Sequence, residues 1–258
     1  MRPKIFIIAR SSSNKAGIEA FLKDIACDAW KSDAENDIAQ IPEIAGRVCY
    51  MSFKRPRPGG NKAYIKHIKE VGHFSVLEHV SWTLAVTGVS RSLTHELVRH
   101  RVGVAISQQS QRYVDESESA VIEPDIVYCN QTTHELFEFA VKSAKLTYKK
   151  LVAELEKELG RPDASFEEKI EIRKKARQAA RAVLPNATQT RLIWTVNART
   201  ARHFLTLRAS RHADTEIRIF ANMLYGVLMR ECPELFDDFK MQMLPDGTFE
   251  LSTDSVEV

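Results

Sequence analysis

The sequence lacks the patterns that usually mark a disulfide framework, a zinc knuckle or a membrane span. Its four cysteines lie far apart and include no Cys-x-x-Cys pair, which excludes a zinc knuckle and favours a reducing compartment. The apolar run at residues 5–9 is too short for a signal peptide or a membrane-spanning helix. We therefore expect a cytoplasmic protein without a membrane partner.

Glycine is scarce as well. Only 10 of the 258 residues are glycine, and none belongs to a G-x-G-x-x-G, a G-x-x-x-x-G-K-[ST] or a G-x-S-x-G motif. These absences exclude the common glycine-rich phosphate loops and the nucleophile elbow of the α/β-hydrolases. Any phosphate must therefore be held by side chains and by helix N-termini.

Neither sign of charge dominates the chain. The 37 basic and 34 acidic residues leave a net charge of +3, which is too even for a protein that coats nucleic acid. The hydrophobic content of 44% is enough for a substantial core. No stretch resembles a linker between folded units, so we predict a single domain over residues 1–258.

Strand patterns and helix patterns occur in separate groups, without a regular βαβ alternation. Strands are expected over residues 4–10, 81–88 and 190–198. Helices are expected over residues 63–72, 90–101, 132–160, 165–185, 199–209 and 213–231. The grouping predicts an α+β fold, with an antiparallel sheet flanked by helices and a central helical hairpin.

One segment is expected to be irregular. Residues 54–62 read KRPRPGGNK, and this content of Pro, Gly and Lys predicts a flexible loop that is a candidate lid.

Three polar clusters stand out against this background. The first, GHFSVLEH at 72–79, holds two histidines and a glutamate, but the spacing matches no zinc pattern and we predict no metal. The second, VRHRVGVAISQQSQRYV at 98–114, combines three arginines with amides and serines. The third, NARTARHFLTLRASRH at 197–212, places arginines and histidines four apart. Arginines with planar forks suit bidentate recognition of phosphate.

Each cluster also has a plain structural interpretation. An isolated RHR is commonly a solvated basic helix end, where arginines complement the helix dipole. Asn197 precedes a predicted helix and can serve as its N-cap. The histidines of the first cluster can be satisfied by hydrogen bonds at a turn.

In this order and combination, the clusters resemble the flavin-dependent thymidylate synthase family. The matching pieces are GHFSVLEH, RHR followed by SQRY, ARAVLP, WTVNAR and FLTLRASRHADTEI, between about residues 44 and 232. The family signature has seven residues between RHR and serine, whereas this chain has eight, VGVAISQQ. Glu96 stands where an amide is expected. The resemblance implies a compact α+β fold that assembles as a homotetramer, with sites made by several subunits.

The resemblance also implies a reaction, the reductive methylation of dUMP to dTMP. The one-carbon unit would come from 5,10-methylenetetrahydrofolate, and NADPH would reduce the FAD that supplies hydride. Flavoprotein, methyltransferase and nucleotide biosynthesis enzyme are the classes that follow. The pyrophosphate of FAD, the phosphate of dUMP and the carboxylates of folate are anions that separate arginine clusters can meet locally.

The same resemblance implies a role for each matching residue. Arg208 would stabilise ionised uracil, and His73 would act near the flavin ring in folate handling and one-carbon transfer. The residues expected to contact FAD are Ser75, Arg99, His100, Arg101, Gln108, Asn197, Arg199 and His203. The residues expected to contact dUMP are Glu96, Gln109, Ser110, Gln111, Arg112, Arg181 and Arg208.

Alternatives remain at this stage. Ser110 could be a nucleophile, although no histidine–carboxylate relay adjoins it in the sequence, and we prefer a binding role. No cysteine is followed by histidine, as a cysteine-dependent thymidylate synthase would require. A flavin reductase without methyl transfer would need only the flavin cluster. A single-stranded RNA-binding module would want aromatic residues among the arginines, and only Tyr113 stands there.

Overall fold

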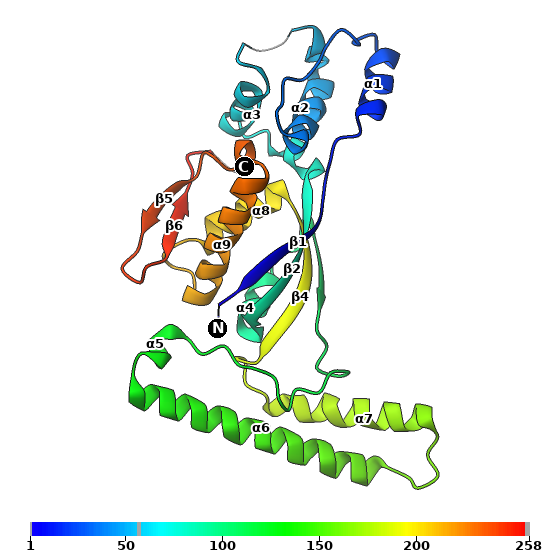
Figure 1. Cartoon of the computed structure of the whole chain (residues 1–258), viewed down its shortest axis with the longest axis vertical. Coiled ribbons are helices and arrows are strands. Elements are labelled where there is room, and N and C mark those ends of the chain that lie inside the picture. The colour runs from blue at the N-terminus through cyan, green and yellow to red at the C-terminus, as the bar shows by residue number, and fades with distance from the viewer. Residues whose placement is uncertain (1, 56–57, 256–258) are drawn as a thin grey trace. The chain divides into compact units, whose positions relative to one another are not determined.

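The computed structural model describes residues 2–55 and 58–255 (Figure 1). The chain divides into two compact units, each made of several stretches. Unit 1 comprises Met1–Lys4, Val86–Val98 and Ser107–Leu192. Unit 2 comprises Ile5–Ala85, Arg99–Ile106 and Ile193–Val258. Compactness does not decide whether such units fold separately, so the single domain stays a prediction.

Four strands form one sheet, in the order β1-β2-β4-β3 (Figure 1). In that order they are Lys4–Arg10, Ser81–Ser90, Gln189–Asn197 and Val104–Gln108. Along β2 and β4 every second side chain is buried, because successive residues of a strand point to opposite faces. The three predicted strands are confirmed. The short strand β3 was not predicted, because its five residues offer little pattern.

Unit 2 contains most of the helices, and an aromatic cluster packs two of them against the sheet. The longer helices are α1 Lys15–Asp24, α2 Asp37–Tyr50, α3 Gly60–Glu70, α8 Ala198–Arg208 and α9 Thr215–Glu231. Short 3₁₀ helices are η1 Ser52–Lys54, η2 Phe74–His79 and η4 Pro233–Leu235. Trp194 of β4, Phe204 of α8 and Phe220 of α9 contact one another, with ring centroids 5.2–5.9 Å apart. These rings fix α8 and α9 against the sheet.

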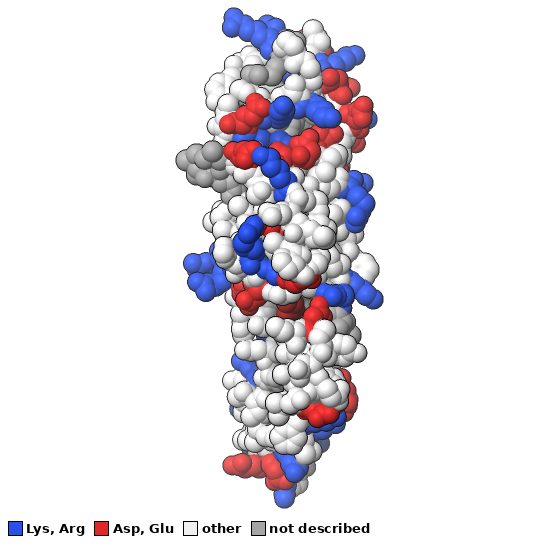
Figure 2. Space-filling view, turned by 90° about the vertical axis from the view of Figure 1, so that its left-hand side faces the viewer, with Lys and Arg blue, Asp and Glu red and all other residues white. Residues whose placement is uncertain are grey.

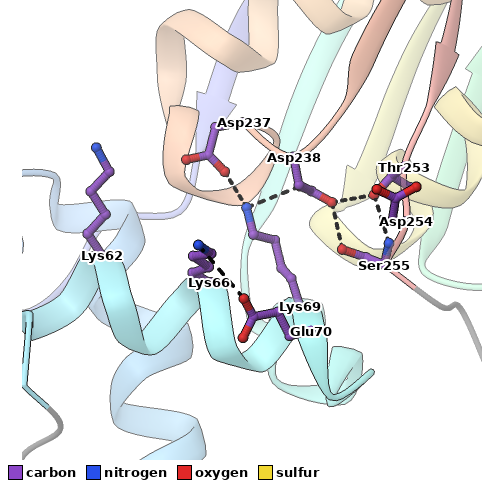
Figure 3. Close-up of a pocket in the computed structure, with 9 residues that line it drawn as sticks. All are labelled: Lys62, Lys66, Lys69, Glu70, Asp237, Asp238, Thr253, Asp254 and Ser255. Atoms are coloured by element: carbon purple, nitrogen blue, oxygen red, sulfur yellow. Dashed lines mark hydrogen bonds and ion pairs between the residues drawn. The ribbon is translucent and has the colours of Figure 1, made fainter.

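Two buried cations anchor the segment after α9 in unit 2. Arg202 of α8 is fully buried and donates to both carboxylate oxygens of Asp238, at 2.7 and 2.6 Å. Lys69 of α3, also buried, pairs with Asp237 and Asp238 beside a pocket of about 550 Å³ (Figure 3). Burial acts to raise the pKa of Asp238, but Arg202 holds it well below its usual range.

An antiparallel hairpin follows this segment, formed by β5 Lys240–Met243 and β6 Phe249–Ser252. Its register pairs Lys240 with Ser252 and Met243 with Phe249. The hairpin and the helices α1 and α2 were not predicted.

Unit 1 contains the predicted helical hairpin. Its two arms, α6 Gln131–Leu159 and α7 Phe166–Ala180, pack side by side (Figure 1). The predicted capping box is present at the start of α7, where Ser165 and Glu168 exchange side-chain to backbone hydrogen bonds of 3.2 and 2.8 Å. The other helices are α4 Arg91–Leu97, α5 Asp125–Tyr128 and η3 Arg181–Val183. Mixed helix and sheet confirm the α+β class.

Two predictions about local structure were wrong. The helix expected over residues 90–101 ends at Leu97, so the RHR motif lies in a turn rather than on a helix. The segment expected to be irregular over residues 54–62 contains the first turn of α3, which begins at Gly60. The backbone N–H of Asn61 donates to Asp33 at 2.7 Å, and this bond stabilises the early start.

Residues 56 and 57 of the same predicted loop lie outside the described residues, so the lid stays a prediction. Among the helices that the structure describes, none has the length and apolar character needed to cross a bilayer.

Candidate active site

His100 is the centre of a cluster in unit 2. Only 8% of its surface is exposed, and its ring packs edge-on against Phe204 and His203, with centroids 5.1 and 6.0 Å away. Its Nε2 accepts a hydrogen bond of 3.0 Å from Nε of Arg208. The proton of the neutral ring must then sit on Nδ1. This contact joins the RHR motif to the end of α8, across 108 residues of sequence.

The same surroundings keep His100 uncharged. Burial lowers its pKa to about 4, and the positive charge of Arg208 and the nearby His203 act in the same direction. At neutral pH the ring is therefore an uncharged acceptor for Arg208.

A pH dependence of stability follows from this pKa. In the unfolded chain His100 titrates near 6.5, so between pH 6.5 and about 4 the unfolded state binds more protons than the folded state. The contribution of His100 to stability is thus complete above pH 6.5 and is lost as the pH falls through this window. We expect the urea midpoint of the wild type to decrease more steeply from pH 7 to 4.5 than that of His100→Asn.

Replacement of His212, an exposed histidine between α8 and α9, is the matched control and should keep the wild-type slope. Equal slopes for the wild type and His100→Asn would contradict the buried neutral ring.

The turn after RHR is docked on the start of α8. Gly103 has a φ of +67°, and a Cβ at this position would lie 2.6 Å from Oγ1 of Thr200 and would collide with Asn197. The Thr200 hydroxyl donates to the carbonyl of Val102 at 2.7 Å. Only glycine tolerates both this backbone conformation and this closeness.

Within this turn the three residues of the motif differ in exposure. His100 is buried, whereas the side chains of Arg99 and Arg101 remain exposed on either side of it.

The start of α8 also meets the first polar cluster. Asn197 is the predicted N-cap, and its side chain accepts from the backbone N–H of Thr200 at 2.8 Å. Arg199 donates to Glu78 of η2 at 2.6 Å. His73, just before η2, contacts the ring of Tyr50 edge-on at 5.8 Å. Unit 2 therefore brings residues from all three sequence clusters together around α8.

The serine–amide segment, residues 108–112, lies in unit 1. Nε2 of Gln108 donates to the hydroxyls of Thr94 and Thr190, at 3.0 and 3.2 Å. The Ser110 hydroxyl accepts from the backbone N–H of Arg112 at 3.3 Å, which is a local turn contact. Within the described residues, no histidine or carboxylate forms a hydrogen bond with Ser110.

Two side chains of this segment hold unused donors. Nε2 of Gln111 and Nε of Arg112 are both buried and have no hydrogen-bond partner among the described residues. A buried donor without an acceptor is costly, so such groups mark a place where a ligand can supply the acceptor.

Two arginines face this part of unit 1, and sequence reasoning missed one of them. Arg91, the first residue of α4, donates to the carbonyl of Gln109 at 3.3 Å. Burial lowers the pKa of Arg91, and nearby Arg181 acts in the same direction, against the opposite effect of Glu116. Two neighbouring guanidinium groups favour binding of an anion. The signal that could have found Arg91 is its place after the helix cap Ser90.

Strand β3, which lies between the RHR motif and Ser110, pairs with β4 in a regular register. The N–H of Asn197 donates to the carbonyl of Gly103 at 3.0 Å, and the N–H of Gln109 donates to the carbonyl of Arg191 at 2.9 Å. Both bonds belong to one antiparallel register, which a bulge between them would break. The register therefore continues without a bulge from Gly103 to Gln109.

Comparison with known proteins shows to which family the chain is similar. Residues 32–234 match the family model described as thymidylate synthase complementing protein. A flavin-dependent thymidylate synthase of Mycolicibacterium vanbaalenii is 46% identical over 222 residues, which are 85% of this chain and 86% of that protein. One of Corynebacterium efficiens is 44% identical over 242 residues, 90% of this chain and 94% of that protein. One of Mycobacterium tuberculosis is 46% identical over 222 residues, with coverage of 85% and 86%.

The chain belongs to the flavin-dependent thymidylate synthase family. The prediction of the family is thereby confirmed, and so is that of an enzyme in thymidylate biosynthesis. The matched region contains every residue that the sequence motifs singled out.

Membership of the flavin-dependent thymidylate synthase family does not by itself assign the individual roles, which stay predictions. The structure sorts the residues into two groups. Those in unit 2 are His73, Ser75, Arg99, His100, Arg101, Asn197, Arg199, His203 and Arg208. Those in unit 1 are Glu96, Gln108, Gln109, Ser110, Gln111, Arg112 and Arg181. With the exceptions of Gln108 and Arg208, the division follows the predicted separation between flavin and dUMP contacts.

Proposed function

We propose that this enzyme converts dUMP to dTMP by reductive methylation. The one-carbon donor is 5,10-methylenetetrahydrofolate, and NADPH is the source of electrons for bound FAD. The observation that carries the proposal is the hydrogen bond from Arg208 to the buried, neutral His100. It joins the two arginine-rich clusters that the proposed chemistry needs in one site. Family membership supports the same reaction.

The residues of unit 2 fit a flavin dinucleotide. Its pyrophosphate requires cations and hydrogen-bond donors, and Arg99 and Arg101 offer exposed guanidinium groups beside the start of α8. Its uncharged ring requires neutral partners, which His100 supplies. The residues of unit 2 that would hold FAD are Ser75, Arg99, His100, Arg101, Asn197, Arg199 and His203, whereas Gln108, the remaining predicted contact, lies in unit 1. When bound, the flavin supplies the hydride that completes the methyl group.

Arg208 has the electrostatic role in the proposed reaction. Its guanidinium donates to the buried His100, whose ring stays neutral and adds no second positive charge beside it. A fixed positive charge stabilises the negative charge that develops on uracil, without reorganisation at the moment of reaction. His73, held edge-on against Tyr50, is the residue we assign to folate handling and one-carbon transfer.

The donors of unit 1 would hold the nucleotide. Gln111 and Arg112 carry buried donors that await an acceptor, and Arg91 and Arg181 add positive charge for a phosphate. Ser110 contributes a hydroxyl, and Glu96 and Gln109 complete the predicted set. Assembly as a homotetramer, in which subunits share their sites, belongs to the same proposal.

The test is direct. Purified protein should be yellow, its flavin absorbance should bleach with NADPH, and it should release tritium from position 5 of labelled dUMP only when methylenetetrahydrofolate is added. Bleaching without tritium release would indicate a flavin reductase instead. Protein that binds no flavin would overturn both assignments.

The surface charge disfavours the RNA-binding alternative. Figure 2 shows basic and acidic side chains interspersed on the visible face rather than gathered in one basic stripe. Single-stranded nucleic acid is bound along a continuous positive groove with aromatic platforms. Tight, salt-dependent binding of a poly(U) oligonucleotide would be required to restore this alternative.

Ser110→Ala should retain measurable activity. Its hydroxyl accepts from the backbone N–H of Arg112, and no base contacts it among the described residues, so we expect the substitution to remove a hydrogen bond and not a nucleophile. Loss of one such bond lowers kcat/KM by about tenfold at most. Tritium release and dUMP binding, measured in parallel, check this. Complete inactivation with intact dUMP binding would revive the nucleophile.

A further inference from the structure

The side chain of Gln109 is committed to the protein at both ends. Its Oε1 accepts from Nη1 of Arg191 at 2.9 Å, and its Nε2 donates to Oε1 of Glu116 at 3.2 Å. Its backbone is held as well, because its N–H donates to the carbonyl of Arg191 and its carbonyl accepts from Arg91. With both ends of its side-chain amide hydrogen-bonded to the protein, Gln109 has little hydrogen-bonding capacity left for a substrate. We call the contact between Gln109 and Glu116 the brace.

Glu116 is the other end of this brace. Only 1% of its surface is exposed, which is unusual for a carboxylate and is tolerated only when hydrogen bonds satisfy its oxygens. The Ser119 hydroxyl donates to its second oxygen. Its backbone N–H donates to the hydroxyl of Tyr148, a buried residue of α6, at 3.4 Å. The backbone of Glu116 is thus anchored to the helical hairpin, and its carboxylate is held by Gln109 and Ser119.

The contact between Gln109 and Glu116 closes a short loop. The residues within it include Ser110, Gln111 and Arg112, the three that we assign to the nucleotide. The backbone N–H groups of Tyr113 and Val114 both donate to the carbonyl of Ser110, so the loop contains a helical turn. Closing this loop at its base reduces the conformations of the segment and aims the buried donors of Gln111 and Arg112.

We propose that Glu116 is a positioning residue for the substrate, which acts through Gln109 on the serine–amide segment. This inference rests on the proposed function, since it requires that the segment binds dUMP. Gln109 then serves as part of the brace and not as a direct contact. Because the brace orders the segment before substrate arrives, its loss raises KM for dUMP more than it lowers kcat.

The experiment compares Glu116→Gln, Gln109→Leu and the double variant with the wild-type flavoenzyme. Each single change removes the charge-assisted contact, and we expect KM for dUMP to rise about tenfold or more with kcat changed less than about threefold. If both act through one contact, the double variant will be no worse than the worse single variant. NADPH-driven flavin bleaching without dUMP should be unchanged, because the flavin residues that we assign lie mainly in unit 2.

Glu118→Gln is the matched control, since this carboxylate of the same segment is exposed and pairs with Lys149 on the surface. It should keep the wild-type KM. A KM for dUMP in Glu116→Gln equal to that of the wild type would overturn the inference, and so would fully additive effects in the double variant. The proposed function would still stand in either case, provided that the wild-type enzyme releases tritium from labelled dUMP. If Glu116→Gln does not fold, Gln109→Leu decides alone: a KM within about twofold of wild type rejects the brace. Wild-type protein that binds no dUMP would reject the proposed function and the brace together.

Discussion

Arg208→Ala will keep its flavin and lose most of its turnover. The guanidinium lies beside a neutral histidine, so the variant removes the fixed positive charge that we assign to ionised uracil. Removal of one preorganised donor of this kind lowers kcat by about 100- to 1000-fold. The ring of His100 should stay in place, because Phe204 still packs against it. Flavin content from absorbance and single-turnover tritium release measure the two effects separately.

Arg211→Ala is the control for Arg208→Ala. Arg211 is exposed and pairs with Glu250 of β6 through its Nε at 2.8 Å, three residues after Arg208. Its removal should leave turnover near that of the wild type. Normal turnover in Arg208→Ala would refute the electrostatic role, and loss of flavin from that variant would assign Arg208 to the flavin instead.

Of the substitutions proposed for this protein, Arg202→Ala will lower the free energy of unfolding the most. Arg202 is fully buried and contacts both oxygens of Asp238 and the carbonyl of Leu235. Among the described residues, truncation leaves the carboxylate of Asp238 with Lys69 as its cation, and the loss of one partner of a buried pair costs about 3–5 kcal/mol of unfolding free energy. Urea denaturation followed by fluorescence measures this loss.

Arg211→Ala is again the control, because it removes an ion pair with Glu250 that lies on the surface. The difference between the two variants therefore measures the effect of burying the ion pair. Exposed ion pairs are screened by solvent, so this change should have little effect on the urea midpoint. A midpoint for Arg202→Ala equal to that of Arg211→Ala would show that the buried pair with Asp238 does not stabilise unit 2.

Local signals in the sequence predicted local structure well. The alternation in SWTLAVTG predicted β2, and Ser165 with Glu168 predicted the capped start of α7. The same kind of reasoning extended α4 to residue 101, because the apolar spacing of Leu93 and Leu97 continues into His100. The helix instead stops at Leu97, and His100 is buried against Phe204, a residue that is distant in sequence. Burial by a distant partner has no local signature.

Site residues were found or missed for similar reasons. The arginines and histidines of α8 were evident because they repeat at helical spacing and lie in recognisable motifs. Arg91 and Glu116 stand in no such pattern, and only their neighbours in unit 1 make them conspicuous. Gln109 was expected to contact dUMP, and the supporting role that we propose for it rests on its bonds to Arg191 and Glu116, which only the structure shows.

The sequence by itself determined the family, the α+β class and the set of residues in the three clusters, because motif order and residue type are properties of the chain. Only the tertiary structure decided that His100 is neutral, that it accepts from Arg208 and that Gln109 is held by Glu116. Charge state and hydrogen-bond partners depend on burial and on distances between residues far apart in sequence, and folding alone sets both.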